Sequence, residues 1–161
     1  MGHYVQQSGF EVFVIGQTTS LEDWKRSLHA PSSELPELTE EQKTFARKFG
    51  ISDEDYARSY LSMSYGQERM RKRGLALGTA IVQILVGLGP GYILQAAIYE
   101  ATKMRWVARI QAPQGLLNVA IPLELADDIV DSNTVQDQEK LKTLLLSSLG
   151  RDELISNRGR A

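Results

Sequence analysis

The chain has 161 residues, of which 42% are hydrophobic and 24% charged, and its formal net charge is −2. This length suits one domain with a sizeable core, and the composition is that of a soluble globular protein rather than a disordered one. The chain has no cysteine, which excludes disulfides, thiolate nucleophiles and cysteine-ligated metals, and its two histidines are His3 and His29. The first residues lack a basic region followed by a long apolar run, so no secretory signal is expected and a cytoplasmic location is the default.

The charge is distributed unevenly along the chain. Residues 1–64 hold six Lys/Arg against ten Asp/Glu, residues 65–111 hold seven against two, and residues 112–161 hold five against eight. A basic middle flanked by acidic ends can bind a polyanion, or it can be neutralised by those ends when the chain folds. Both interpretations stay open at this point.

The first segment, residues 8–30, is expected to form a strand and a helix. Residues 10–15 are rich in β-branched and aromatic residues and lie between glycines, which predicts a buried strand. Ser20 with Asp23 has capping-box spacing, and a short amphipathic helix should follow. Its apolar face consists of Leu21, Trp24 and Leu28. Two prolines and two serines in residues 31–38 then predict an extended linker.

Residues 39–64 are predicted to form a helical hairpin. Thr39 with Gln42 makes a second capping box, and Gly50 and Ser52 mark the turn into another helix. The spacing of small and apolar residues is like that of a helix-turn-helix. In that motif the start of the second helix approaches the DNA, where three acids would repel phosphate: Asp53, Glu54 and Asp55. A hairpin used for packing is therefore the preferred interpretation.

Residues 74–99 form an apolar stretch without one charged side chain. A membrane-spanning helix needs about 20 consecutive apolar residues, whereas residues 75–88 would give a helix of roughly 21 Å. Gly87, Gly89, Pro90 and Gly91 interrupt the stretch. A core helix followed by a strand is therefore preferred to a membrane span.

The core helix is expected to start after a bend near Tyr65 and Gly66. Small residues at Gly74 and Gly78 permit close approach of a neighbouring element. The second half of this helix is apolar on all sides. That pattern predicts burial between layers or an obligate dimer interface.

Three alternating segments follow, at residues 92–99, 104–111 and 116–122. Residues 112–115 supply Pro and Gly for a hairpin loop, so an antiparallel meander is predicted. Alternation places Met104, Trp106, Ala108 and Ile110 on one face, and Arg105, Val107, Arg109 and Gln111 on the other. The first face should pack under the helix of residues 75–88, and the second should present its arginines.

Two more helices are predicted after the meander. Residues 123–131 form a short helix with an acidic stripe, which consists of Glu124, Asp127, Asp128 and Asp131. The stripe could bind a hard cation, but it lacks a glycine-bearing calcium loop, and a solvated face opposite the basic segment is preferred. Asn133 or Thr134 caps a last helix that Gly150 ends. Its inward-facing residues should be Val135, Leu141, Leu144, Leu145 and Leu149.

These elements predict a single α+β domain over residues 1–161. A three-stranded antiparallel meander, which the N-terminal strand can join, packs on a long central helix and C-terminal helices, after a helical hairpin. The parts are a strand and helix at 8–30, a linker at 31–38, a helical hairpin at 39–64, a helix-meander-helix core at 65–150 and a frayed tail at 151–161.

The sequence contains no recognisable catalytic, cofactor or metal signature. His29 has no second imidazole near it in sequence, and the glycine-rich residues 87–91 leave a helix instead of entering one, unlike a phosphate loop. We therefore expect a non-enzymatic binding or adaptor protein that needs no cofactor.

The candidate binding residues are basic. They are Arg69, Arg71, Lys72 and Arg73 on the central helix and Arg105 and Arg109 on the sheet, with Tyr92 or Tyr99 for stacking. Nucleic acid is slightly favoured as the partner. The alternative is a protein-interaction module, in which the basic segment meets an acidic protein surface or the chain's own acidic stripe and the apolar helix forms a homodimer.

Overall fold

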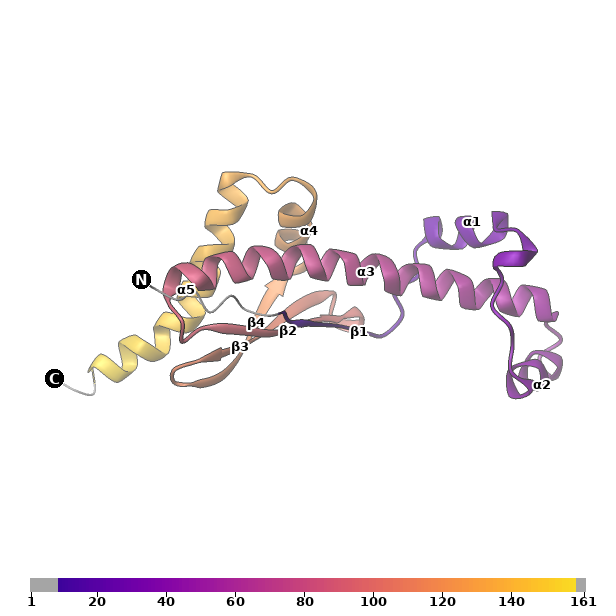
Figure 1. Cartoon of the computed structure of the whole chain (residues 1–161), viewed down its shortest axis with the longest axis horizontal. Helices are drawn as coiled ribbons and strands as arrows, with labels where there is room; N and C mark the ends of the chain where they lie inside the picture. The colour runs from indigo at the N-terminus through magenta and orange to yellow at the C-terminus, as the bar shows by residue number, and fades with distance from the viewer. Residues whose placement is uncertain (1–8, 159–161) are drawn as a thin grey trace. The chain divides into compact units, whose positions relative to one another are not determined.

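The computed structural model describes residues 9–158, and the chain divides into two compact units. The sheet unit combines Met1–Gly16 with Arg71–Ala161, and the helical unit is Gln17–Met70. The described residues form five α-helices and one four-stranded sheet (Figure 1). The predicted α+β class is confirmed.

The sheet contains the predicted meander together with the N-terminal strand. Its order is β1 (Glu11–Ile15), β2 (Ile93–Glu100), β3 (Arg105–Ala112) and β4 (Gly115–Pro122). β1 runs parallel to β2, whereas β2, β3 and β4 are antiparallel neighbours. Ala112 pairs with Gly115, which leaves Pro113 and Gln114 in the hairpin loop. A short 3₁₀ turn at Ala101–Lys103 joins β2 to β3.

The prediction that β1 is a buried strand is wrong. β1 is the edge strand of the sheet, and Phe13 and Ile15 on its outer face are exposed. Val12 on its other face lies against the central helix, since a Cβ placed on Gly74 would lie 2.5 Å from Val12 Cγ1. An apolar run of this length cannot distinguish an edge strand from a central one, which explains the error.

The central helix α3 (Asp53–Leu88) is continuous, so the predicted bend near Gly66 is wrong. A glycine inside a helix costs only about 1 kcal/mol relative to alanine, which a long packed helix tolerates. Here Gly66 is needed for close approach, because a Cβ at this position would lie 2.9 Å from the Thr18 carbonyl oxygen. The predicted break after residue 88 is confirmed, with Gly89 at φ +127. Among the described residues, no helix has the length and apolarity that crossing a membrane would require.

The core of the sheet unit lies on one face of the sheet. α3 approaches this face through Gly74, whose added Cβ would also lie 2.8 Å from the Trp106 ring. The helices α4 (Leu123–Asp131) and α5 (Val135–Arg158) contribute to the same core. The largest fully buried side chains are Trp106, Leu77, Ile81, Leu85, Leu94, Ile110, Ile121, Leu141 and Leu145. The predicted cover of the meander by the 75–88 helix is therefore confirmed.

Three details of the helices differ from the predictions. Leu75 and Val86 on α3 are about half exposed, so the second half of that helix is not buried between layers. α5 passes through Gly150 and reaches Arg158, so the predicted helix end and the start of the tail at 151 are wrong, and residues 159–161 lie outside the described part.

Val135, predicted to face inward, is exposed at the first position of α5. Thr134 is the cap, because its Oγ1 accepts from Asp137 N at 3.1 Å.

The helical unit contains α1 (Leu21–His29), a 3₁₀ turn at Ser32–Glu34, α2 (Glu40–Lys48) and the N-terminal part of α3. Both predicted capping boxes are present, at Ser20 and at Thr39. The hairpin of α2 and α3 also forms as expected, with Ala46 fully buried and Gly50 in the turn at φ +69. α1 and α2 lie on opposite sides of this part of α3 (Figure 1).

Candidate interaction surfaces

Arg69 holds two parts of the helical unit together. Its Nη2 donates to the Thr18 carbonyl at 2.7 Å and to Asp23 Oδ2 at 3.2 Å. Burial raises the pKa of Asp23, but the hydrogen bonds from Ser20 and the ion pair with Arg69 outweigh that effect and hold the pKa below its usual value of 3.8. Arg69 is thus already paired with an anion inside the helical unit.

Arg73 is paired with the acidic stripe of α4. Its Nη1 donates to Asp131 Oδ1 at 2.9 Å, and its Nη2 donates to Asp127 Oδ1 at 2.7 Å. The hydrogen bond to Asp131 is the main reason that the pKa of Arg73 lies above its usual range, and the same bond lowers the pKa of Asp131. The stripe therefore neutralises part of the basic segment, as one interpretation of the sequence expected.

The two remaining stripe residues lie apart from this ion pair. Glu124 is exposed and Asp128 is half-buried on α4. Within residues 9–158 there is no group of three or more side chains that could hold a metal ion. The stripe consequently has one visible role, which is to bind Arg73.

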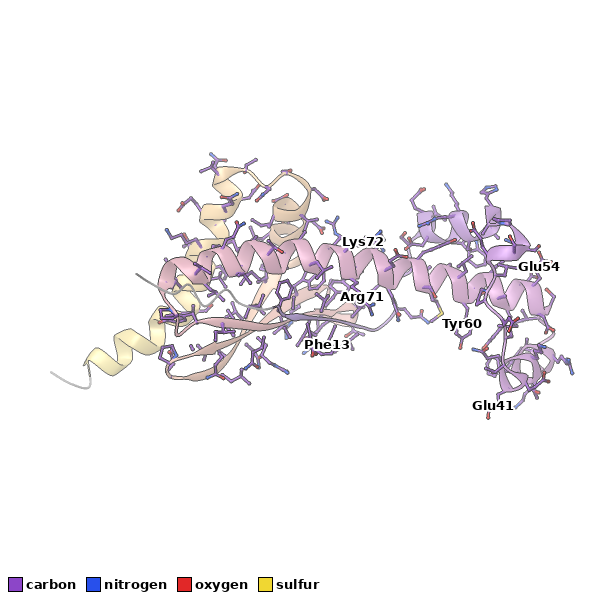
Figure 2. All side chains as sticks on the ribbon, viewed as in Figure 1. Phe13, Glu41, Glu54, Tyr60, Arg71 and Lys72 are labelled. Carbon is purple, nitrogen blue, oxygen red and sulfur yellow. The ribbon has the colours of Figure 1, made fainter. Side chains whose placement is uncertain are left out.

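Arg71 and Lys72 are exposed, as is Arg69, and Figure 2 labels the first two. No hydrogen bond or ion pair of the Arg71 side chain is found within the described chain. With Arg69 and Arg73 bound to carboxylates, the segment offers much less free cationic charge than its sequence suggests. This weakens it as a phosphate-binding surface.

Arg105 and Arg109 lie on the sheet face opposite the core, as predicted. Both are half-buried, and Val107 between them is buried. Arg105 Nε is 3.6 Å from Glu100 Oε2, which is an ion-pair distance but too long for a hydrogen bond. Arg109 has no side-chain hydrogen bond or ion pair within the described residues. The sheet thus presents one paired and one unpaired guanidinium.

Tyr99 is not available for stacking on a ligand. Its ring packs on Trp106 at a centroid distance of 5.1 Å, and its side chain is buried in the core. Strand alternation explains this, because Tyr99 pairs with Trp106 and points to the same face. Met104 also departs from the prediction, since it precedes β3 in a left-handed conformation and is exposed. Tyr92 precedes β2 and is half-buried.

α1 is fastened to α3 by polar contacts. Arg58 Nη1 donates to the carbonyl oxygens of Ser27, Leu28 and Ala30, at 2.7, 3.3 and 2.9 Å. These oxygens belong to the C-terminal end of α1, where carbonyls lack helical partners and the helix dipole is negative. Arg58 therefore fixes one end of α1, and Arg69 fixes the other end through Asp23.

This attachment leaves the apolar face of α1 in solvent. The buried residues of α1 are the polar ones, Asp23 and Ser27. In contrast, Leu21, Trp24 and Leu28 are 66%, 40% and 47% exposed. An amphipathic surface helix ordinarily turns its apolar stripe to the core. Here the orientation is inverted, and the α1 face, defined as Leu21, Trp24 and Leu28, is left without a cover in the described chain.

A second exposed apolar surface lies across α3, on the α2 side. Four aromatic rings form an aromatic row, with centroid distances of 4.7, 5.9 and 5.3 Å between successive members: Phe49, Phe45, Tyr56 and Tyr60. Phe49, Phe45 and Tyr60 are 59%, 50% and 37% exposed. Met63, one turn beyond Tyr60, is exposed too. Figure 2 shows Tyr60 on α3 and Glu41 on α2.

The sequence interpretation did not identify either exposed apolar surface. The i, i+3, i+7 spacing of the α1 face and the i, i+4 spacings of the aromatic row were visible in the sequence. Such spacing normally marks a core contact, so it could not reveal that these faces stay exposed. The missing information was the pairing of Arg58 and Arg69 with α1, which joins residues about 30 and 46 positions apart.

A hollow of about 340 Å³ lies between α3 and α5 within the sheet unit. Its lining is mostly apolar, with Ile84, Leu88 and Leu141, and Lys142 is its one charged residue. It therefore offers no acid and base pair of the kind that general catalysis uses.

Comparison with known proteins gives no further guidance. No protein-family model, curated protein or solved structure matches this chain.

Proposed function

We propose that this protein is a non-enzymatic binding or adaptor protein that engages a protein partner through its helical unit. The observation that carries the proposal is the inverted orientation of α1. Trp24 and its neighbours on the α1 face are exposed, while Arg58 and Arg69 hold the polar side of the helix against α3. Contiguous exposed apolar surface of this kind is typical of protein interaction sites.

The charge of the helical unit supports a protein partner over nucleic acid. Residues 17–70 contain seven Lys/Arg against ten Asp/Glu, a net charge of −3. The start of α3, where a helix-turn-helix would meet DNA, carries three exposed acids: Asp53, Glu54 and Asp55. A phosphate backbone would be repelled by this unit.

The experiment is a selection of random peptides displayed on phage against the full chain. Enriched peptides should share an amphipathic pattern, and their affinity, measured by fluorescence anisotropy, should fall at least tenfold when Trp24 and Leu28 are both changed to alanine. Phe13→Ala, at an exposed apolar position of the sheet unit, is the matched control and should leave affinity unchanged. No enrichment, or enrichment insensitive to the double substitution, would overturn the proposal.

Nucleic acid binding is the second candidate, favoured by Arg71 and by the unpaired guanidinium of Arg109. Because Arg69 and Arg73 support the fold, the informative variant changes Arg71, Lys72 and Arg109 to alanine. Phosphate contacts would give a log–log salt slope of about 0.9 per contact on duplex DNA, and this slope should shrink in the variant. A wild-type protein that fails to bind duplex or single strands at low salt eliminates this candidate.

A further inference from the structure

We infer that the partner of the α1 face is the aromatic row of a second copy of this chain, so that copies join head to tail. This inference rests on the proposed function, because it names the occupant of the same surface. It is carried by two complementary surfaces on one unit, the α1 face and the aromatic row, both exposed.

The two surfaces match in length and chemistry. Leu21 and Leu28 are seven residues apart on α1, and Tyr56 and Met63 are seven residues apart on α3. At about 1.5 Å per residue, the α1 face and the α3 part of the second surface, from Tyr56 to Met63 at the end of the aromatic row, each extend about 10.5 Å along their helix. An amphipathic helix with apolar residues at i, i+3 and i+7 is the ligand that a long apolar helical surface accepts. Trp24 would then meet aromatic rings, which favour tilted contacts with one another.

The net charges beside the two surfaces are opposite in sign. Lys25 follows Trp24 and lies on the same side of α1, about 40° from Leu21 around the helix. Glu41 precedes Phe45 by one turn of α2, and Asp53 precedes Tyr56 by one turn of α3. Lys48 also lies beside the aromatic row, with its Nζ 6.0 Å from the Phe49 ring centroid, so this row has two acids against one lysine. Lys25, Glu41 and Asp53 have no ion pair within the described residues. Lys25 of one copy can consequently pair with Glu41 or Asp53 of the next.

The same charges argue against a symmetric contact. Two α1 faces brought together would place Lys25 against Lys25, and two aromatic rows would bring together two surfaces of net negative charge. Like charges in an interface are unfavourable, whereas the head-to-tail contact pairs unlike ones. A heterologous contact is therefore the arrangement that the charges allow.

The position of the two surfaces predicts an open chain instead of a closed dimer. Arg58 contacts α1, and Tyr60 belongs to the aromatic row. The two residues are two positions apart on α3, which at about 100° per residue places them on nearly opposite sides of the helix. α1 and α2 accordingly lie on opposite sides of the helix (Figure 1). A pair of copies that makes one contact still has one free surface at each end, and further copies can add.

The test uses two variants that each lose one surface, Trp24→Asp and Tyr60→Asp. In sedimentation velocity, the wild-type mass should rise with concentration beyond that of a dimer, and each variant alone should stay monomeric. An equal mixture of the two variants should form a 1:1 dimer and nothing larger, because Trp24→Asp retains the aromatic row and Tyr60→Asp retains the α1 face. Circular dichroism checks that both variants keep the wild-type helical content.

Val86→Asp, at an exposed position on the sheet unit, is the matched control and should leave association unchanged. A wild-type protein that stays monomeric while its α1 face binds selected peptides would overturn this inference and leave the proposed function standing. A dimer that neither variant disrupts, or that Val86→Asp abolishes, would also overturn it. Restored association in the mixed sample is the result that a merely destabilised variant cannot give.

Discussion

The sheet unit and the helical unit hold their helices in opposite ways. In the sheet unit, α3 approaches the sheet through Gly74 and Gly78, and the buried residues are apolar, as with Leu77 and Trp106. In the helical unit, α1 is held by guanidinium groups, and its apolar face is exposed. Apolar burial is the main contact between α3 and the sheet in the first unit, whereas the second unit has apolar surface left for an additional contact.

The difference also explains why the basic segment is a poor guide to function. Arginines in this chain bind groups on other helices: Arg58 binds carbonyl oxygens at the end of α1, Arg69 binds the buried Asp23, and Arg73 binds two aspartates of α4. A guanidinium with several donors suits this task, because one side chain can bind two or three acceptors. A cluster of arginines in this sequence therefore indicates contacts between helices as much as it indicates a binding surface.

The largest effect is expected for Trp106→Ala in the sheet unit. The Trp106 ring is fully buried, packs on Tyr99 and lies under Gly74. Removing it should lower the free energy of unfolding by about 3–5 kcal/mol, through lost burial and a cavity. Urea denaturation measures this loss. Trp24→Ala in the helical unit is the control and should change stability by less than about 1 kcal/mol. Equal losses in the two variants would contradict the comparison.

A smaller loss is expected for Gly74→Ala. The added Cβ would lie 2.5 Å from Val12 and 2.8 Å from the Trp106 ring, so α3 would have to move away from the sheet. We expect a loss of about 1–3 kcal/mol, as for overpacked cores. Gly87→Ala is the matched control, because a Cβ there meets no neighbouring atom within 4 Å. That control should gain about 0.5–1 kcal/mol from helix propensity. A neutral result at Gly74 would show that the contact can relax.

Most of the sheet unit could be predicted from the sequence. The alternation of β3, a hairpin at residues 112–115 and the break after Leu88 are local signals, and each is confirmed, although the hairpin loop is shorter than predicted because Ala112 pairs with Gly115. The boundaries of α4 are also as predicted. Local periodicity and turn chemistry determine these features, which is why the sequence sufficed.

The exposed surfaces could not be predicted, for the same physical reason. Leu21, Trp24 and Leu28 have the spacing of a core-facing stripe, and local spacing does not say which side of a helix meets its neighbour. Arg58 and Arg69, which contact α1 across long sequence separations, determine which side of α1 faces α3. The neutralisation of Arg73 by Asp131, 58 residues away, is another such contact. Long-range ion pairs are the part of the site that a single sequence does not reveal.

Arg58→Ala should affect the helical unit alone. The variant loses three hydrogen bonds to the C-terminal carbonyls of α1 and the ion pair with Glu54. Hydrogen bonds to a charged group are worth about 1.5–3 kcal/mol, so the amides of α1 should exchange with solvent roughly ten- to a hundredfold faster. Arg47→Ala, at an exposed residue with no side-chain partner within residues 9–158, is the control. Unchanged hydrogen exchange in α1 would show that Arg58 does not hold α1 against α3.

The smallest effect is a pH dependence confined to α1. The pKa of Asp23 is below its usual value of 3.8 when the chain is folded, because Ser20 and Arg69 stabilise the carboxylate more than burial disfavours it. The unfolded chain therefore takes up this proton first, and the stabilisation is complete above about pH 4. It should decline as the pH falls from there through the folded pKa. Hydrogen exchange of the α1 amides should then accelerate earlier than that of β3. Asp23→Asn should remove this difference in pH dependence, since the amide does not titrate, and an unchanged profile in that variant would assign the effect to another group.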